Sequence, residues 1–506
     1  MALSARAAAT SSQVNRLPRV EYIYEPNLIV PLAASFNQRG IRGFTQAITN
    51  SDDQLKINSV YEPIRNAGTG KSTLYLVKRP GVSSNGLTYG VSTQIAYLHE
   101  VGGSNSHIVI AVQGNDIVAA DNATTTTVSS SASFRPAFID KASINVTTDY
   151  LILQLRSGNS HSAYFALTNL APFTQITVAA PNPIGKMEFL DGYGFQADAD
   201  GRIFNSDLNT VSTWGAASWI KRRTMQDDQL GLAKLGQQII SLGSASMEVF
   251  RNAGNAFGSP LEHVPSLTQR YGLANPNATH MRHYYAVLGG RMYWRGQNPV
   301  GIFSYDGSNV EKVSSLAIDK IIAENQHYFV GRIGFSGKTA ITIGLDTPIS
   351  GTQRALLYFP EWNDWFLWTS SVFIPNGSQR DENACIGLGA AGAGAIVFLI
   401  SEATENYTDG GTNYAWTHQF KLPKRGNGFQ KMDMFGLVGD TTSSSQLIDV
   451  QFSDDDYQSF TTARTIDMSR AEKMITRCGG YKSRAVKLSY TGSLGLRLEQ
   501  AVARIS

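Results

Sequence analysis

Cysteine is nearly absent from this chain of 506 residues, and charged residues are scarce. Cys385 and Cys478 are the two cysteines; they are too few for a disulfide framework and cannot hold a zinc ion by themselves. We interpret both as buried thiols in a reducing compartment, and no redox function is expected. Charged residues make up 16% of the chain, below the roughly one quarter that is typical of soluble domains.

Neither sign of charge dominates. Lys and Arg number 43 and Asp and Glu number 40, which leaves a formal net charge of +3. This is too small an excess for a protein that coats nucleic acid by neutralising its phosphates. Any contact with DNA is therefore expected to be local or purely geometric.

No apolar run reaches the roughly 20 residues of a membrane-spanning helix. The nearest run, residues 385–400, is short and rich in glycine, and it predicts a turn that leads into a buried strand. The first 20 residues contain three arginines and no acid, which superficially resembles a transit peptide. Because this stretch has no secretory apolar core, we favour a flexible or docking arm.

Glycine and aromatic residues are abundant instead: 47 Gly, 23 Phe, 21 Tyr and 7 Trp, a profile typical of a turn-rich β protein. Apolar and polar residues alternate on both sides of turn-forming pairs, which is the pattern of β-hairpins. The predicted turns lie at Gly114-Asn115, Ser157-Gly158-Asn159, Asp200-Gly201, Gly243-Ser244, Asp306-Gly307 and Asn363-Asp364. At Gly243 the pattern suits the first central position of a type II′ turn.

The spacing of these turns favours a repeated unit. The turns at 115, 200, 307 and 364 are 85, 107 and 57 residues apart, roughly one or two multiples of the 45–55-residue period of a four-stranded propeller blade. We therefore predict an all-β fold, with a β-propeller-like body built of antiparallel hairpins and an additional C-terminal β domain. A β-sandwich or stacked barrels remain alternatives because the units share little sequence.

Changes along the sequence, from successive hairpins to loop-rich segments, predict three parts. Residues 1–60 form an N-terminal arm and the first strands, residues 61–401 the propeller-like body, and residues 402–506 the C-terminal β domain. The last part supplies four further strands within 446–468 and 484–505. If the body is a propeller, one of these strands or the segment 21–30 must close the ring, and the number of blades stays open.

A phosphate-binding loop is suggested by Gly70-Lys71-Ser72 within Asn66–Thr73. The glycine that such a loop needs five residues before Gly70 is replaced by Arg65, and the residues that follow alternate like a strand where a helix should begin. We therefore predict neither nucleotide binding nor ATPase activity. Lys71→Ala should change nothing in an ATP-binding assay.

A calcium loop is suggested by Asp198, Asp200, Gly201 and Asp207. Gln196 occupies the first ligand position, Asp207 is shorter than the glutamate usual at the last, and strand-like flanks stand where helices belong. A hairpin turn is the better interpretation.

The remaining chemical motifs are equally weak. Ser453–Phe460 resembles the Asp box, a structural hairpin turn of many β repeats, with Tyr457 in place of its glycine. His280 and His283 have no acidic or cysteine partner at metal spacing. A glycosidase would need two carboxylates about 5–9.5 Å apart, which a sequence cannot show. We predict no catalytic, cofactor-binding or metal-binding residues, no cofactor, and no enzyme activity.

One ordered set of elements is more specific. Gly201–Leu208 reads Gly-Arg-Ile-Phe-Asn-Ser-Asp-Leu and is followed by Trp214, by Asp228 before Leu230, by a Gly243 turn leading to Met-Glu-Val-Phe with Glu248, and by a Gly254–Pro260 loop. This order resembles the packaged-DNA stabilisation, or tail nozzle, proteins of short-tailed bacteriophages. Segments 301–322, 356–368 and 451–468 resemble the later blades and last hairpin of that family. Arg222 and Arg223 depart from it, where a more acidic approach to Asp228 is expected.

The resemblance implies a structural virion protein of the phage tail, made in the host cytoplasm. Such proteins form a homo-oligomeric ring, usually a hexamer, below the portal and a portal-proximal adaptor protein. The ring holds a tail needle, plug, fibre or spike, and genomic DNA passes through its lumen without sequence specificity. The implied function is to retain packaged DNA and pass it during ejection.

A different class of function shares many of these features. A carbohydrate-binding or glycan-cleaving β-propeller tail protein that recognises the host surface would also have many hairpins and aromatic residues. A carboxylate cluster at the propeller mouth would favour that alternative, and a ring with a pore would favour the nozzle.

Overall fold

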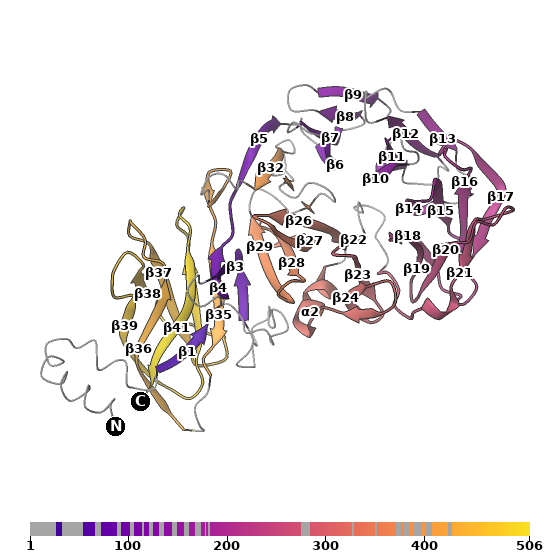
Figure 1. The fold of residues 1–506 in the computed structure, drawn as a ribbon. Helices are drawn as coiled ribbons and strands as arrows, with labels where there is room; N and C mark the ends of the chain where they lie inside the picture. Colours follow the sequence, from indigo (N-terminus) through magenta and orange to yellow (C-terminus); the bar gives the residue numbers. More distant parts are fainter. Residues whose placement is uncertain are drawn as a thin grey trace, which may run out of the picture.

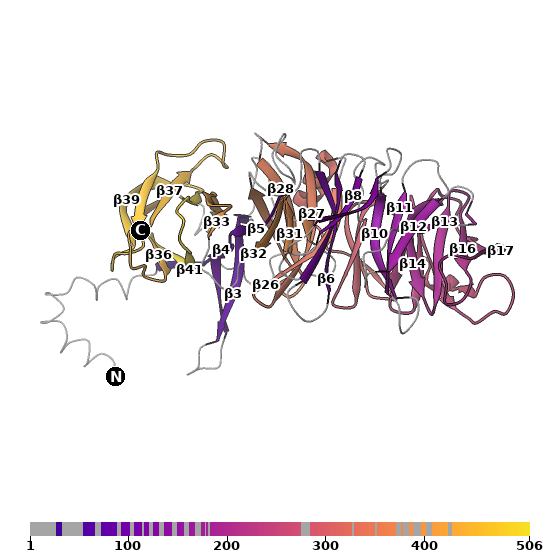
Figure 2. The same cartoon turned by 90° about the horizontal axis from the view of Figure 1, so that it is seen from above.

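The chain folds into a ring of antiparallel sheets with a separate pair of sheets at one side (Figures 1 and 2). The computed structural model describes residues 27–32, 54–65, 72–88, 93–101, 106–113, 116–120, 125–130, 136–143, 149–155, 161–166, 174–177, 179–180, 183–274, 284–325, 328–349, 352–370, 376–377, 384–387, 396–400, 407–423 and 428–505. Residues 66–71 of the predicted phosphate loop lie outside these ranges, whereas Ser72 and Thr73 begin a strand. Gly114-Asn115, His280, His283 and residues 1–26 also lie outside them.

Seven four-stranded blades can be traced in the described residues, and the predicted β-propeller is confirmed. Blades one to three comprise β6 (Thr93–Val101), β7 (Ser106–Gln113), β8 (Asp116–Ala120), β9 (Thr125–Ser130); β10 (Pro136–Ser143), β11 (Asp149–Leu155), β12 (His161–Ala166), β13 (Thr174–Thr177); and β14 (Pro183–Leu190), β15 (Tyr193–Asp198), β16 (Arg202–Ser206), β17 (Trp214–Lys221).

The other blades follow in chain order, apart from one strand of the seventh. They comprise β18 (Gln229–Leu235), β19 (Gln238–Gly243), β20 (Met247–Asn252), β21 (Leu261–His263); β22 (Tyr285–Leu288), β23 (Arg291–Gln297), β24 (Val300–Tyr305), β25 (Val310–Lys312); β26 (Tyr328–Phe335), β27 (Lys338–Ile349), β28 (Thr352–Phe359), β29 (Asp364–Ser370); and β30 (Asn376–Gly377), β31 (Ala384–Gly387), β32 (Ile396–Ile400) with β5 (Val82–Thr88). Helix α2 (Leu316–Glu324) joins blades five and six, and a 3₁₀ turn, η2 (Pro265–Leu267), follows blade four.

Strand β5 closes the ring. It pairs antiparallel with β32, with Ile400 opposite Val82 and Ile396 opposite Thr88. The ring is therefore fastened by main-chain hydrogen bonds between segments more than 300 residues apart. The closing strand is neither of the two segments expected from the sequence.

The second unit is a β-sandwich made from both ends of the described chain. One sheet has the order β3 (Ser59–Arg65), β4 (Ser72–Lys78), β41 (Arg497–Ile505), β36 (Gln430–Gly439), β39 (Met474–Tyr481), with β1 (Asn27–Pro31) on β41. The other has the order β2 (Gln54–Ile57), β35 (Trp416–Lys421), β40 (Ala485–Tyr490), β37 (Leu447–Ser453), β38 (Arg464–Asp467). A short hairpin of β33 (Thr408–Asp409) and β34 (Thr412–Asn413) extends blade seven beyond β5.

The predicted division at residues 60 and 61 differs from this arrangement, because that boundary falls inside β3. Strands β3 and β4 belong to the sandwich, where Leu76 and Val77 pair with Leu498 and Arg497. The first blade strand in the chain is β5, which begins at Val82. The physical reason is that β41 needs a partner on each edge: β36 pairs with one edge, and the N-terminal strands β1 and β4 pair with the other.

Buried apolar residues join the two units into one body. One core contains sandwich residues such as Val60, Phe435 and Val450 together with Phe366 and Trp368 of blade six. Parallel pairing of β2 with β29, at Ile57 and Leu367, carries the sheet of blade six into the sandwich. The sandwich therefore extends a propeller blade.

Candidate functional site

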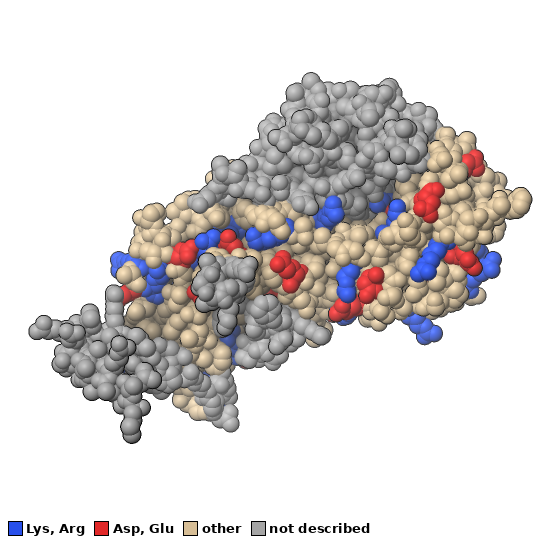
Figure 3. Space-filling view, viewed as in Figure 1, with Lys and Arg blue, Asp and Glu red and all other residues tan. Residues whose placement is uncertain are grey.

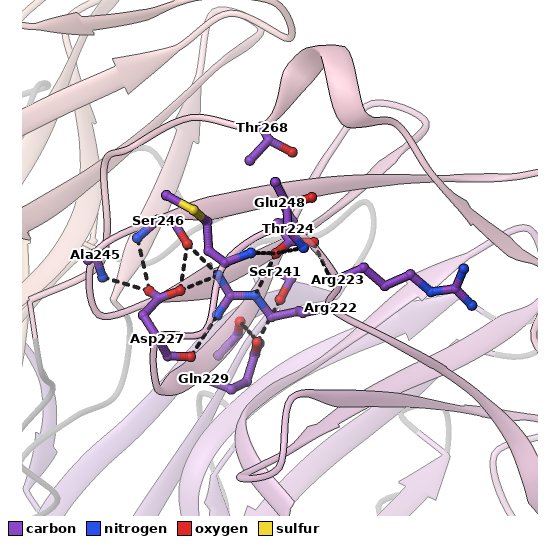
Figure 4. A network of polar contacts seen from close by, with 12 residues as sticks. Arg222, Arg223, Thr224, Asp227, Gln229, Ser241, Ala245, Ser246, Glu248 and Thr268 are labelled. Carbon is purple, nitrogen blue, oxygen red and sulfur yellow. Dashed lines mark hydrogen bonds and ion pairs between the residues drawn. The ribbon is translucent and has the colours of Figure 1, made fainter.

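The stretch with the specific sequence elements, residues 192–265, folds into blades three and four, and two of its carboxylates, Asp227 and Glu248, meet at Arg222 (Figure 4). Arg222 follows β17 directly, and its side chain is buried. Its Nη2 donates to Asp227 Oδ1 at 2.9 Å and to Ser246 Oγ at 2.5 Å. One guanidinium thus holds the loop between the blades against the β19–β20 turn.

Glu248 anchors the other side of this loop. Its carboxylate has no exposed surface and accepts backbone N–H bonds from Arg223, Thr224 and Met225 at 3.1–3.2 Å. Consecutive N–H groups that converge on an anion form a concave site of the kind that binds phosphate elsewhere. Here the anion is part of the chain, so the concavity serves to fix the loop.

Asp227 binds the tip of the neighbouring turn. Its carboxylate accepts hydrogen bonds from the N–H groups of Ala245 and Ser246, at 2.7 and 3.0 Å, and from Ser246 Oγ. Partial burial opposes ionisation, but these hydrogen bonds and the Arg222 charge outweigh it and lower the pKa of Asp227.

The Gly243 turn exists, but the predicted reason for its glycine was wrong. Strands β19 and β20 are joined by residues 244–246, and Gly243 is not among the glycines with positive φ. A Cβ at Gly243 would lie 2.2 Å from Asp227 Oδ2 and 2.3 Å from Arg222 Nη1. The glycine is needed because the ion pair occupies the space that a side chain would fill.

A second polar cluster links the inner strands of blades three to five. Tyr284 Oη accepts from the N–H groups of Lys186 and Leu232 and donates to the Leu232 carbonyl. Tyr285 Oη donates to Glu188 Oε1 at 2.7 Å. Burial raises the pKa of Tyr284, so its hydroxyl stays protonated and able to donate.

A third cluster fixes the sandwich to the propeller. Arg79 donates to both carboxylate oxygens of Asp409, at 2.9 and 2.5 Å, and its Nε donates to Asn58 Oδ1 at 2.9 Å. Lys56 pairs with Asp364, the first residue of β29. The Asp364 carboxylate also accepts a hydrogen bond from Tyr61 Oη at 2.6 Å. All of these side chains are buried.

Hydrogen bonds within the chain hold both the turn that resembled a calcium loop and the Asp-box-like turn. Gly201 has φ +80° in the β15–β16 hairpin, and Asp198 is buried and bonded to Arg202 Nε at 2.8 Å. In the Asp-box-like segment, Ser453 Oγ accepts from the Tyr457 N–H and Asp455 accepts from the Ser459 N–H. Within the described ranges no group of three His, Cys, Asp or Glu residues could hold a metal ion. No helix among the same residues is long and apolar enough to cross a membrane.

Sequence reasoning singled out Arg222, Asp228 and Glu248 but not what they contact. Asp228 is exposed, and its carbonyl accepts from the Ser244 N–H. Arg222 instead pairs with Asp227, which explains one of the two basic residues that depart from the expected pattern. Tyr284, Arg79 and Asp409 were missed because their partners are far away in the chain and no local pattern marks them.

Comparison with known proteins identifies this architecture. The family model described as Bacteriophage P22 Gp10, beta-propeller, matches residues 50–332, from before β2 through blades one to five and into β26. The chain belongs to this bacteriophage tail nozzle family. Nozzle family proteins are structural components of the virion tail, so the predicted family and its general role are confirmed.

Other comparisons add little to the nozzle assignment. A search of curated proteins gave no match. Solved structures similar to this chain include BBS1N in complex with ARL6DN, with 13% identity and a TM-score of 0.41 over 64% of this chain and 99% of that one. BamB from Moraxella catarrhalis has 11% identity and a TM-score of 0.35 over 68% of this chain and 99% of that one. The WD40 beta propeller domain of Doa1 has 10% identity and a TM-score of 0.38 over 64% of this chain and 98% of that one.

Proposed function

We propose that several copies of this chain, six by the resemblance, form a closed ring below a portal-proximal adaptor protein in the tail of a short-tailed phage. The ring retains packaged DNA and passes it during ejection, and it holds a needle, plug, fibre or spike protein. The observation that carries the proposal is the family match over blades one to five. A heterologous contact repeated with a closing rotation produces such a ring.

The rigid links between blades support a mechanical role. The Arg222 cluster joins blades three and four, the Tyr284 cluster joins blades three to five, and the Arg79 cluster joins the propeller to the sandwich. Buried networks with charge-assisted hydrogen bonds resist rearrangement. A wall that must contain densely packed DNA benefits from that resistance.

The distribution of charge supports passage without tight binding. The net charge is +3, and on the face shown in Figure 3 Lys and Arg alternate with Asp and Glu without a broad basic area. Tight binding to phosphates would also slow a genome that must slide out.

Particles assembled without this chain test the proposal. We expect such particles to package DNA and then lose it, as measured by nuclease-accessible DNA over time. Purified protein should hardly shift a DNA fragment at physiological salt. Particles that keep their genomes, or a salt-sensitive nanomolar affinity for duplex DNA, would contradict the retention role. Cleavage of host-surface glycan by the purified protein would favour the carbohydrate-active alternative.

A further inference from the structure

Large exposed apolar side chains gather at the two ends of the described structure. Leu208, Trp219 and Phe257 lie on blades three and four, whereas Ile29, Phe429, Leu447 and Leu494 lie on the sandwich; Leu316 on α2 is the other such residue among those described. Strand β17 and the sandwich strands β37 to β39 occupy opposite ends of the long axis in both views (Figures 1 and 2). Single exposed apolar residues are ordinary, but their concentration at two opposite ends suggests contact surfaces.

The blade end carries a stripe of one aromatic and two basic side chains, which we call the β17 patch: Trp219, Lys221 and Arg223. Trp219 is 39% exposed, and the three residues alternate with less exposed or buried neighbours. The Arg223 side chain points away from the Arg222 cluster in Figure 4. Neither Lys221 nor Arg223 has a side-chain partner in the described structure, whereas nearby Arg202 is paired with Asp198 and Asp200.

The sandwich end carries a complementary pair, which we call the β37 patch: Leu447 and Asp449. Leu447 is 53% exposed, and both residues face away from the core on alternate positions of β37. Asp449 has no side-chain partner among the described residues. Asp467, across the sheet from Leu447, is already engaged by Ser445 and Ser469.

We propose that the β17 patch of one copy docks on the β37 patch of the next copy. Residues two positions apart on a strand lie roughly 6.5–7 Å apart, so Trp219 can meet Leu447 while Lys221 meets Asp449. The two patches differ and lie at opposite ends, so the contact is heterologous and can be repeated around a ring. This inference rests on the proposed ring and names the surfaces that form it.

Charge reversal tests the contact. Lys221→Glu and Asp449→Lys should each raise the dissociation constant for self-association at least tenfold in sedimentation velocity at low salt, because each places like charges together. The double variant should recover association. So should an equimolar mixture of the two single variants, because every contact in an alternating ring then joins opposite charges.

Matched controls separate this contact from general charge effects. Lys320→Glu reverses an exposed lysine on α2, away from both patches, and should leave association unchanged. Trp219→Ala should weaken association more than Leu316→Ala, since an aromatic residue in a contact contributes strongly to binding. Circular dichroism melts confirm that each variant is folded.

Three outcomes would overturn the proposal: single reversals that associate like the wild type, folded double variants that fail to recover, or a wild-type chain that stays monomeric at every concentration. The DNA-leakage experiment does not depend on these residues. If particles without the chain leak DNA while charge reversal has no effect on association, the retention role stands and this contact is wrong.

Discussion

The clusters around Arg222 and Arg79 use the same chemistry over different spans of chain. Arg222, Asp227, Ser246 and Glu248 lie within 27 residues of one another and join two consecutive blades, whereas Arg79 and Asp409 are separated by 330 positions and join two units. Both bury a guanidinium against carboxylates. The Arg222 cluster, here called the loop cluster, can form as soon as its two blades fold. The Arg79 cluster, here called the junction cluster, requires both ends of the chain to be in place.

Removing the junction arginine should have the largest effect. Arg79→Met leaves Asp409 buried without its cation, which typically destabilises by about 3–5 kcal/mol. Chemical unfolding should show this loss, and Arg79→Met combined with Asp409→Leu should restore much of it because no buried charge remains. Arg470→Met, at an exposed ion pair, should change stability by less than about 1 kcal/mol. Equal effects at Arg79 and Arg470 would contradict the importance of the junction.

Removing the Glu248 carboxylate from the loop cluster should reduce stability by a smaller amount. Glu248→Ala deprives three backbone N–H groups of their acceptor, and buried unsatisfied donors cost about 1–3 kcal/mol. The substitution also removes the ion pair of Glu248 with Arg222, whose Nε lies 3.6 Å from the carboxylate. We expect a lower free energy of unfolding and faster proteolysis within residues 222–228. Mass spectrometry of the proteolytic fragments measures the rate of cleavage in this loop. Glu262→Ala, at an exposed acid on neighbouring β21, is the control and should be cut no faster than the wild type.

The junction should also be sensitive to acid through His418. This side chain is fully buried between Trp416 and Phe420, and neither ring nitrogen has a hydrogen-bond partner among the described residues. Lys56 lies opposite it on β2, and Leu488 lies opposite it on β40. Burial, followed by the Lys56 charge, holds the pKa of His418 well below its ordinary value of 6.5.

The sign of this pH effect follows from the neutral ring in the folded state. Below about pH 6.5 the unfolded chain takes up a proton that the folded chain does not. The free energy of unfolding therefore decreases as the pH is lowered, until the pKa of the folded state is reached. For one proton the slope approaches about 1.4 kcal/mol per pH unit. His418→Phe should flatten the dependence of unfolding free energy on pH in this range. An unchanged slope would show that another group is responsible.

The smallest effect is expected at the hairpin beside the loop cluster. Gly201 has φ +80°, and a Cβ there would find its nearest neighbour, Arg222 Cβ, at 3.9 Å. Gly201→Val therefore strains the backbone without a clash and should destabilise by about 1 kcal/mol or more. Gly201→Ala should cost less. Calcium should leave the melting temperature of the wild type unchanged, and a calcium-dependent rise would restore the metal-site interpretation.

Local turn chemistry explains what could be predicted from the sequence. Hairpins at Asp200-Gly201 and Asp306-Gly307 follow from residues that tolerate positive φ, and the structure has them there, with φ +80° and +99° at the glycines. Strands β37, β38, β40 and β41 were likewise expected from alternation. Of the candidate site, only the importance of the 192–265 stretch was foreseen, on the basis of family resemblance.

Distance along the chain explains what could not be predicted. The seventh blade contains β5 together with β30, β31 and β32, so its four strands are not consecutive in the sequence. No local period in the sequence therefore reveals this blade. Gly243 was assigned to a turn type because its clash with Arg222 and Asp227 depends on three segments meeting in space. The contact between Arg79 and Asp409 joins residues on either side of the propeller sequence.

The dependence of the sandwich on both chain ends also has a consequence for synthesis on the ribosome. Strands β3 and β4 leave the ribosome early and can pair with each other, yet the other edge of β4 finds β41 only when Arg497 and Leu498 have been made. At about 5–20 residues per second, this interval lasts roughly 20–80 s. During that time this edge of β4 stays open to pairing with other nascent chains, so slower translation would prolong the exposure of an edge strand that can aggregate.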